Sequence, residues 1–468
     1  MTLRSVTSER SVHRPISTPS LAEPEGEVDV AIVGAGAAGI AAARFCRAAG
    51  ASTAVLEARD RVGGRAVTVR LGGHAVDLGA HWLHAGGLNP LVRLGRERGE
   101  AIRRAPGQGH VVLDGRFGTR ADREAHGRGF EAADRAFAAA ARRDGDVSLA
   151  QALPPLGRWR APIAATMALI SGRPLAEVSA QDFPSDEFGD NYFIRGGYGA
   201  FLARLAAGLP VRLGCPVTAI DWSGPGVRLS TPRGTVRARA AVVTVPMPLL
   251  AGGAIRFAPG LPPGMAEALS GFLPGAYEHV VLQWPDAPFR GADRLAKIVT
   301  VRRSLGLLTW IEGAPIHYLE LDYATALAAS GRDRAARLAR DFLAGVLGTH
   351  AIRNMRVLAV TDWLSDPLSR SSWSVVPPGR VAIRTEAAKP VADRIWFAGE
   401  ATSRSLWGTV GGAWEEGERA AREVLAIVGR GEPERPGEAR RPNSPPAGND
   451  VSASAWRTNA REATSSGA

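Results

Sequence analysis

The pattern of apolar residues predicts alternating strands and helices near the start of the chain. Residues 28–33 are apolar apart from Asp29, a stretch of small residues follows at 40–49, and a second apolar run covers 53–56. Continuous apolar runs of this length are typical of strands that are buried on both faces of a parallel sheet. The small-residue stretch between them predicts a helix, so the chain opens with a β-α-β unit.

Later stretches repeat this pattern. Residues 240–245 form an apolar run that Pro246 stops, and residues 394–397 form another. Small and apolar residues then recur at helical spacing from 413 to 428, which predicts a helix with one packed face. The packed positions are Ala413, Gly417, Ala421, Val424 and Val428, and the positions expected to face water are Glu415, Glu418, Arg422 and Glu423.

The middle of the chain has a different character. Residues 91–195 are predicted to be helical, because apolar residues recur at helical spacing over 130–140. Residues 253–372 are predicted to form strands, with one helix near 334–347. The acidic segment 185–190 has two interpretations, a solvated loop or a carboxylate cluster that attracts a cationic amine.

The turn after the first strand carries a glycine pattern that binds dinucleotides. Gly34, Gly36 and Gly39 form G-x-G-x-x-G, and Glu57 follows the second strand. The first glycine permits a tight turn, the second lets the backbone approach a pyrophosphate, and the third lets helix and strand pack closely. The pyrophosphate would lie at the helix N-terminus, where unpaired N–H groups favour an anion. Glu57 would bind ribose hydroxyls and would repel the extra phosphate of NADP.

Two further motifs follow this unit. Residues 58–65 read A-R-D-R-V-G-G-R, a second glycine turn in which Arg65 is placed to meet phosphate. Residues 77–84 read D-L-G-A-H-W-L-H. His81 and His84 lie near His74, but no carboxylate or cysteine stands at a zinc-binding spacing, so no metal site is predicted.

Together these motifs resemble the flavin-containing amine oxidases, which include monoamine, polyamine and L-amino-acid oxidases and histone demethylases. Residues 79–84 with Asn89-Pro90 are most similar to polyamine oxidases, and F-A-G-E-A-T at 397–402 is similar to a family signature. The resemblance implies FAD, where the glycine pattern alone leaves NAD open. The FAD-binding residues that it implies are Gly34, Gly36, Ala38, Gly39, Glu57, Ala58, Arg59, Gly64, Arg65, Gly79, Ala80, His81, Trp82, Val217, Gly399, Glu400, Thr409 and Val410.

The resemblance also implies the fold, an α/β FAD-binding Rossmann-like domain interleaved with an α+β substrate-binding domain. The FAD-binding domain is predicted at 27–90, 196–252 and 373–430. The substrate domain is predicted to have a helical part at 91–195 and a sheet part at 253–372. Residues 1–26 and 431–468 are rich in polar residues and proline, and are predicted to be a disordered arm and tail.

His279 is the position where the sequence departs from this family. The family usually has a lysine there, which holds a water near flavin N5 and assists the reaction with oxygen. Neither Lys297 nor Lys389, the two lysines of the chain, readily fills this role from its place in the sequence. A histidine is a cation only below its pKa, ordinarily about 6.5. We therefore expect the reaction with oxygen to be faster below that pH and slow above it.

The resemblance implies the other site residues as well. Trp373 stands where the family has one wall of an aromatic cage over the flavin, and Thr409 stands where monoamine oxidases have the second wall. Trp363 lies in the family pattern W-x-x-D-P, and His84 coincides with the active-site histidine of polyamine oxidases. Ser372 occupies the position of the flavin-linking cysteine of monoamine oxidases, so non-covalent FAD is expected.

Composition bears on the partners of the protein and on its location. The chain has 468 residues with 57 basic and 46 acidic side chains, and the arginines are scattered, which disfavours nucleic acid as a partner. Two distant cysteines suggest a reducing compartment, so a cytoplasmic location is expected. No apolar run has the length of a membrane span, and residues 1–26 do not resemble a Sec-type signal peptide.

Three functions remain open at this point. The first is an oxidase of a polyamine or another secondary or primary amine, with oxygen or another electron acceptor reoxidising the flavin. The second is an L-amino-acid oxidase, which needs an arginine aimed at the substrate carboxylate. The third is a non-catalytic FAD-binding protein, suggested by the missing lysine and the half-present cage.

Overall fold

The computed structural model describes residues 26–105, 108–183, 190–289, 291–299, 304–329 and 331–431. The predicted arm up to residue 25, the tail from 432, and all but the last residue of the acidic segment lie outside these ranges. The described residues belong to one compact unit. The domain boundaries within it remain a prediction.

The first sheet has eight strands and contains the predicted β-α-β unit. In order across the sheet, its strands are β13 (Arg256–Ala258), β10 (Ala219–Asp221), β11 (Val227–Thr231), β12 (Gly234–Val243), β1 (Val28–Val33), β2 (Thr53–Leu56) and β9 (Val211–Arg212), with β21 (Ile395–Phe397) beside β12. From β9 through β2, β1 and β12 to β21 the pairing is parallel. Every residue of β1 and β2 is buried, which confirms the parallel α/β sheet.

Helices cover this sheet and form a common core with it. Apolar side chains of α1 (Ala37–Ala48), α6 (Tyr198–Ala206) and α12 (Val410–Ile427) pack with those of β1 and β12. Further helices and strands of the structure are β3 (Thr68–Leu71), β4 (His74–Asp77), α2 (Pro90–Glu97), α7 (Met247–Ala251), α8 (Pro263–Ser270), β14 (Leu273–Gly275), β20 (Trp373–Val375) and α11 (Ile383–Ala388).

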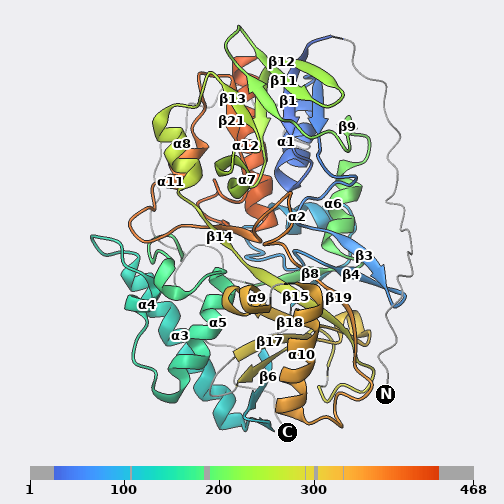
Figure 1. Ribbon diagram of the computed structural model, residues 1–468, viewed down its shortest axis with the longest axis vertical. Coiled ribbons are helices and arrows are strands. Elements are labelled where there is room, and N and C mark those ends of the chain that lie inside the picture. Colours follow the sequence, from blue (N-terminus) through green and yellow to red (C-terminus); the bar gives the residue numbers. More distant parts are fainter. Residues whose placement is uncertain are drawn as a thin grey trace, which may run out of the picture. The chain divides into compact units, whose positions relative to one another are not determined.

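The second sheet has seven strands, and it lies below the first in the view of Figure 1. In order, these strands are β19 (Arg356–Val360), β15 (Tyr277–Gln283), β18 (Ile316–Asp322), β17 (Ser304–Thr309), β16 (Arg294–Val299), β6 (Gln108–Leu113) and β7 (Arg116–Phe117). Side chains alternate between its two faces. Val280 and Leu282 pack in a core with α10 (Arg332–Leu347), while Val281 packs on the opposite face with Val76 and Tyr318.

The predicted helical region contains strands that its sequence pattern did not indicate. Besides most of α2, its α-helices are α3 (Arg120–Ala140), α4 (Leu149–Ala152) and α5 (Arg160–Ser171). However, β5 (Ile102–Arg104) pairs with β8 (Tyr192–Ile194), and β6 joins the second sheet. The strand β6 pairs in parallel with β16, which lies almost two hundred residues further along the chain. A pairing at that separation leaves no local periodic signal.

Helix α12 corrects one expectation about exposure. Gly417, Ala421 and Val424 are buried as predicted, but Glu415 and Glu423 are partly buried and do not simply face water. Burial raises the pKa of Glu415 to about 7. Glu418 and Arg422 are also partly buried. The reason is that α12 packs between α1, the first sheet and α2, so it has no fully solvated side.

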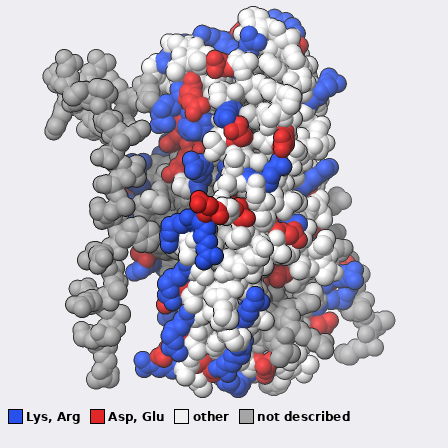
Figure 2. Space-filling view, turned by 90° about the vertical axis from the view of Figure 1, so that its left-hand side faces the viewer, with Lys and Arg blue, Asp and Glu red and all other residues white. Residues whose placement is uncertain are grey.

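Charged side chains of both signs occur on the face drawn in Figure 2, with basic side chains gathered along its lower left part. Many arginines have acidic partners, among them Arg103 with Asp293 and Arg204 with Glu100. In the described part of the chain, no helix is both long enough and apolar enough to span a membrane.

Candidate active site

A cavity of about 560 Å³ is lined by residues of both sheets. With the exception of Gly39, every residue predicted to bind the cofactor or the substrate lines this cavity. The structure therefore brings together Gly34, Ala38, Ala58, Gly79, Ala80, Val217, Gly399 and Val410 with Trp363, Trp373, His84, Thr409 and His279. Their individual roles remain predictions.

The glycine turn is packed too tightly for side chains at two of its three glycines. Gly34 has a φ of +103°, and a β-carbon there would lie 2.6 Å from the Thr244 hydroxyl. A β-carbon on Gly39 would overlap the carbonyl of Gly34, so Gly39 acts through helix–strand packing and not through the cavity. At Gly36 the nearest protein atom to a β-carbon is the α-carbon of Gly64, 3.9 Å away. The space beside Gly36 is therefore open toward the cavity.

Glu57 holds the glycine turn in place. Its carboxylate accepts hydrogen bonds from the backbone N–H of Ala35 at 2.7 Å and of Arg59 at 2.8 Å. Each carboxylate oxygen has further acceptor capacity, and Glu57 lines the cavity. The same side chain can therefore fix the turn and accept from hydroxyl groups of a ligand.

Two of the three arginines of the second glycine turn, Arg59 and Arg65, are paired with acidic side chains. Arg59 makes a two-pronged ion pair with Asp366 at 2.7 and 3.1 Å. Arg65 pairs with Glu400 at 3.1 Å and donates to the backbone oxygen of Ser372. Asp366 belongs to the W-x-x-D-P motif, so these contacts join motifs that lie about three hundred residues apart in the sequence. Contact of either arginine with phosphate remains a prediction.

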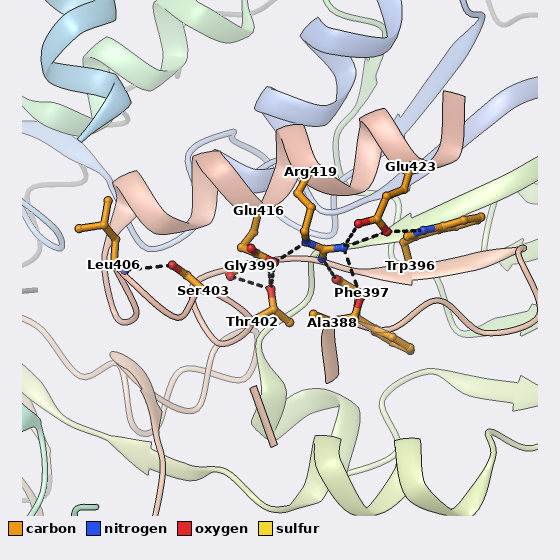
Figure 3. A network of polar contacts seen from close by, with 10 residues as sticks. All are labelled: Ala388, Trp396, Phe397, Gly399, Thr402, Ser403, Leu406, Glu416, Arg419 and Glu423. Carbon is orange, nitrogen blue, oxygen red and sulfur yellow. Dashed lines mark hydrogen bonds and ion pairs between the residues drawn. The ribbon is translucent and has the colours of Figure 1, made fainter. Parts of the chain in front are cut away.

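A polar network joins α12 to the turn that follows β21 (Figure 3). Arg419 donates to the carbonyl of Phe397 at 2.9 Å and pairs with Glu416 at 2.9 Å. Glu416 accepts from the Thr402 hydroxyl at 2.6 Å, and the Thr402 hydroxyl oxygen accepts from the backbone N–H of Gly399 at 3.2 Å. The network fixes the start of α12 relative to the turn that lines the cavity.

Aromatic rings form one wall of the cavity. The indole of Trp363 donates to the carbonyl of Leu78 at 3.0 Å, and that of Trp373 donates to the carbonyl of Ser171 at 3.1 Å. Tyr277 lies beside Trp373 with ring centroids 5.7 Å apart. Each indole has its N–H satisfied by the backbone, so both rings are held in one orientation.

Thr409 is the N-cap residue of α12. Its hydroxyl accepts from the backbone N–H of Gly412 at 3.0 Å and donates to the carbonyl of Leu406 at 2.7 Å. Both bonds are local to the helix start. Thr409 thus directs the N-terminus of α12, with its partial positive charge, at the cavity.

Two buried histidines, His81 and His279, and the partly buried His84 line the cavity. His279 lies 4.9 Å from His81 and 5.0 Å from Tyr277 between ring centroids. Burial lowers the pKa of His279 to about 3 and the pKa of His84 to about 4. The pKa of His81 is also held well below its ordinary value, mainly by burial. All three rings are neutral at physiological pH.

Comparison with known proteins identifies the family of this arrangement. The family model described as flavin containing amine oxidoreductase matches residues 150–425, and the model of an NAD(P)-binding Rossmann-like domain matches residues 32–94. The chain is 30% identical to polyamine oxidase 2 of Arabidopsis thaliana over 452 residues, which covers 85% of the chain and 88% of that protein. The chain belongs to the flavin-containing amine oxidoreductase family.

Other relatives and solved structures show the breadth of this similarity. The chain is 28% identical to nicotine dehydrogenase of Pseudomonas putida, across 86% of the chain and 89% of that protein. A solved structure of putrescine oxidase bound to putrescine matches with a TM-score of 0.72 and 22% identity, covering 86% of the chain and all of that structure. The second likeness supports the fold alone.

As an amine oxidoreductase of this family, the protein is an enzyme whose cofactor is FAD. The residues present fit that cofactor. Open space beside Gly36 and the carboxylate of Glu57 line the cavity. Aromatic rings, among them Trp373, and the N-terminus of α12 at Val410 line it as well. The first group suits a dinucleotide, and the second suits a planar ring that gains negative charge on reduction.

The structure overturns the expected titration of His279. From the sequence, His279 was expected to have a pKa near the ordinary value of about 6.5. Burial lowers the pKa to about 3, because the ring lies among His81, Tyr277 and Tyr318 and away from water. His279 therefore cannot serve as a cation in the pH range where the sequence analysis expected a switch.

Three cavity residues were missed by the sequence analysis as site residues. Tyr277 precedes His279 by two positions on β15 and shares its face, which the alternation of a strand could have revealed. Lys297 and Glu320 lie on β16 and β18 and are buried in the cavity wall. Their strands come together only through the sheet topology, so no local pattern marks them.

Metal ligands were not predicted, and the described residues contain no group of three or more His, Cys, Asp or Glu that could hold a metal ion.

Proposed function

We propose that this family member oxidises a primary or secondary amine, including the polyamine class, to an imine that water hydrolyses to an aldehyde. The glycine turn and Glu57 would hold FAD, which would supply the redox chemistry: removal of a hydride from the carbon next to the amine nitrogen, with oxygen, giving hydrogen peroxide, or another acceptor taking up the electrons. The observation that carries the proposal is one continuous cavity that joins the dinucleotide-type glycine turn to the aromatic wall. FAD is expected to be held without a covalent bond, because Ser372 is not a linking cysteine.

The protein's part in this reaction is to position a neutral amine and to exclude water. The rings of Trp363, Trp373 and Tyr277 supply apolar faces that orient the reacting carbon and attract a developing cation. His84 and His279 are neutral, so they do not repel the positive charge that forms on the nitrogen. The unprotonated nitrogen of a neutral histidine can also hold a water molecule by accepting a hydrogen bond from it.

A neutral His279 favours an acceptor other than oxygen. A fixed cation stabilises the negative charge that oxygen gains from a reduced flavin. His279 cannot supply that cation, because burial holds its pKa at about 3. We therefore propose a second candidate function, an amine dehydrogenase, which differs from the amine oxidase in using an electron acceptor other than oxygen.

An L-amino-acid oxidase is less well supported. Its substrate carries the carboxylate on the reacting carbon, so a cation must lie close to the reaction. Among the described residues that line the cavity, the arginines are Arg59 and Arg65, and both are paired with acidic side chains. Lys297 lies three strands from the strand of His279, about 14 Å by the usual strand spacing.

The proposal is tested with the purified protein and a panel of amines and amino acids. We expect amines to bleach the flavin without oxygen, and intact FAD to be released when the protein is denatured by acid. Peroxide and reduction of an artificial acceptor are followed in parallel to separate oxidase from dehydrogenase. A flavin that no amine reduces would support a non-catalytic FAD-binding protein, and flavin retained on the precipitate would refute non-covalent binding.

The reaction of the reduced protein with oxygen is expected to be slow and insensitive to His279 between about pH 5 and 9. The pKa of His279 lies near 3, so its charge does not change over that range. His279→Lys should accelerate the reaction, most at low pH, because burial lowers the pKa of a lysine there and the cation persists only below it. Stopped-flow mixing with oxygen across a pH series, with His279→Ala as the control, measures this. A rate in the native protein that falls from pH 5 to 8 and is flat in His279→Ala would contradict it.

A further inference from the structure

A row of side chains crosses the second sheet and lines the cavity, beginning at His279 beside the aromatic ring of Tyr277. His279 on β15 is paired directly with Glu320 on β18, Glu320 with Gly306 on β17, and Gly306 with Lys297 on β16. Directly paired residues project from the same face of a sheet. His279, Glu320 and Lys297 all line the cavity, and each is at least 96% buried.

Gly306 allows the acid and the base of this row to approach each other. A β-carbon on Gly306 would overlap the carboxylate of Glu320, so this carboxylate lies over β17 and points toward β16. Lys297 begins one strand spacing further on, about 5 Å away. A lysine side chain is long enough to span that distance, so the ammonium group can reach the carboxylate.

The surroundings of this pair are apolar or uncharged. Phe130, Leu169, Ile170 and Leu295 also line the cavity, and Leu295 lies on the same strand and face as Lys297. His126 on α3 is fully buried, and its pKa is lowered to about 4 by burial and by the charge of Lys297. A buried acid and base in such surroundings stabilise each other's charge, and removal of either leaves an uncompensated ion.

We infer that Lys297 neutralises Glu320, and that the cavity therefore selects amines with one basic nitrogen and an apolar body over diamines and polyamines. The inference rests on the proposed amine oxidation and narrows its substrate class. Glu320 alone would attract a second ammonium group at the far end of a substrate. With Lys297 beside it, a second ammonium group meets a like charge, while an uncharged chain end meets apolar side chains.

Three probes of equal chain length test this selection: hexylamine, hexamethylenediamine and ε-aminocaproate. The native holoenzyme should be reduced most efficiently by hexylamine. Lys297→Met should raise the preference for hexamethylenediamine relative to hexylamine by roughly tenfold or more, because Glu320 becomes an uncompensated anion. Glu320→Gln should shift preference in the opposite direction, toward ε-aminocaproate, because Lys297 becomes an uncompensated cation.

Flavin reduction without oxygen and binding by calorimetry are measured for each probe, and thermal unfolding confirms that each variant is folded. Lys389→Met removes a lysine at an exposed position outside the cavity, where it pairs with Glu386, and should leave the preference unchanged. Native protein that prefers the diamine, or variants with unchanged preferences, would overturn the inference even if amines reduce the flavin. If no amine reduces the flavin, the proposed function fails, and the calorimetric ranking still decides the charge preference.

Discussion

Replacing Gly36 by valine is expected to give a folded protein that contains no flavin. Gly36 has a φ of −76°, which any residue can adopt, and a β-carbon there meets no protein atom closer than 3.9 Å. The new side chain instead fills the space at the N-terminus of α1, where the pyrophosphate of FAD is predicted to lie. The expected loss is complete, because the dinucleotide and the valine cannot occupy the same volume.

Absorbance at the flavin maximum measures the flavin content of the variant, and circular dichroism shows whether it is folded. Gly224→Val is a suitable control, because a β-carbon there meets nothing within 4 Å and the residue lies away from the cavity. Gly39→Val should behave differently and fail to fold, since its side chain would overlap the carbonyl of Gly34. A yellow Gly36→Val protein would show that the dinucleotide does not bind over Gly36.

Replacing Arg384 by methionine is expected to lower the free energy of unfolding by about 3–5 kcal/mol, the usual cost of removing one partner of a buried ion pair. The Arg384 side chain is 1% exposed and pairs with both oxygens of Asp182 at 2.6 and 2.7 Å. It also donates to the backbone oxygens of Ala401 and Ser374. Its loss leaves the carboxylate of Asp182 buried and unpaired.

This ion pair also supports the cavity wall, so flavin retention should fall together with stability. The guanidinium lies 5.0 Å from the Trp407 ring centroid, and the Trp407 indole donates to the carbonyl of Asp182. Urea unfolding measures the change, with Arg332→Met on the exposed side of α10 as the matched control. Adding Asp182→Leu should recover much of the loss, because the uncompensated charge is removed. Stability of Arg384→Met within about 0.5 kcal/mol of the native protein would refute a structural role for the pair.

The FAD-binding half of the fold could be predicted from local patterns. The strands β1, apart from Asp29, and β2 are apolar runs, because both faces of a parallel sheet are buried. In β12 only residues 240–243 have this character, and the glycine turn lies between β1 and α1 as predicted. Glu57 was predicted as a ligand of ribose, and the structure adds that it also holds the turn through Ala35. Each of these features depends on residues close together in the sequence.

The sequence by itself thus determined the Rossmann-like sheet, the family and its FAD, and which motifs line the cavity. Only the tertiary structure decided what depends on burial and on distant pairing. It moved the pKa of His279 to about 3, because a neutral ring is favoured where water is excluded. It also brought Lys297 and Glu320 to one end of the cavity, through pairing of β16, β17 and β18 that no local periodicity records. The pKa values and the pairing of charges at a site depend on burial and on neighbouring side chains. These neighbours are set only when strands that are distant in the sequence lie side by side.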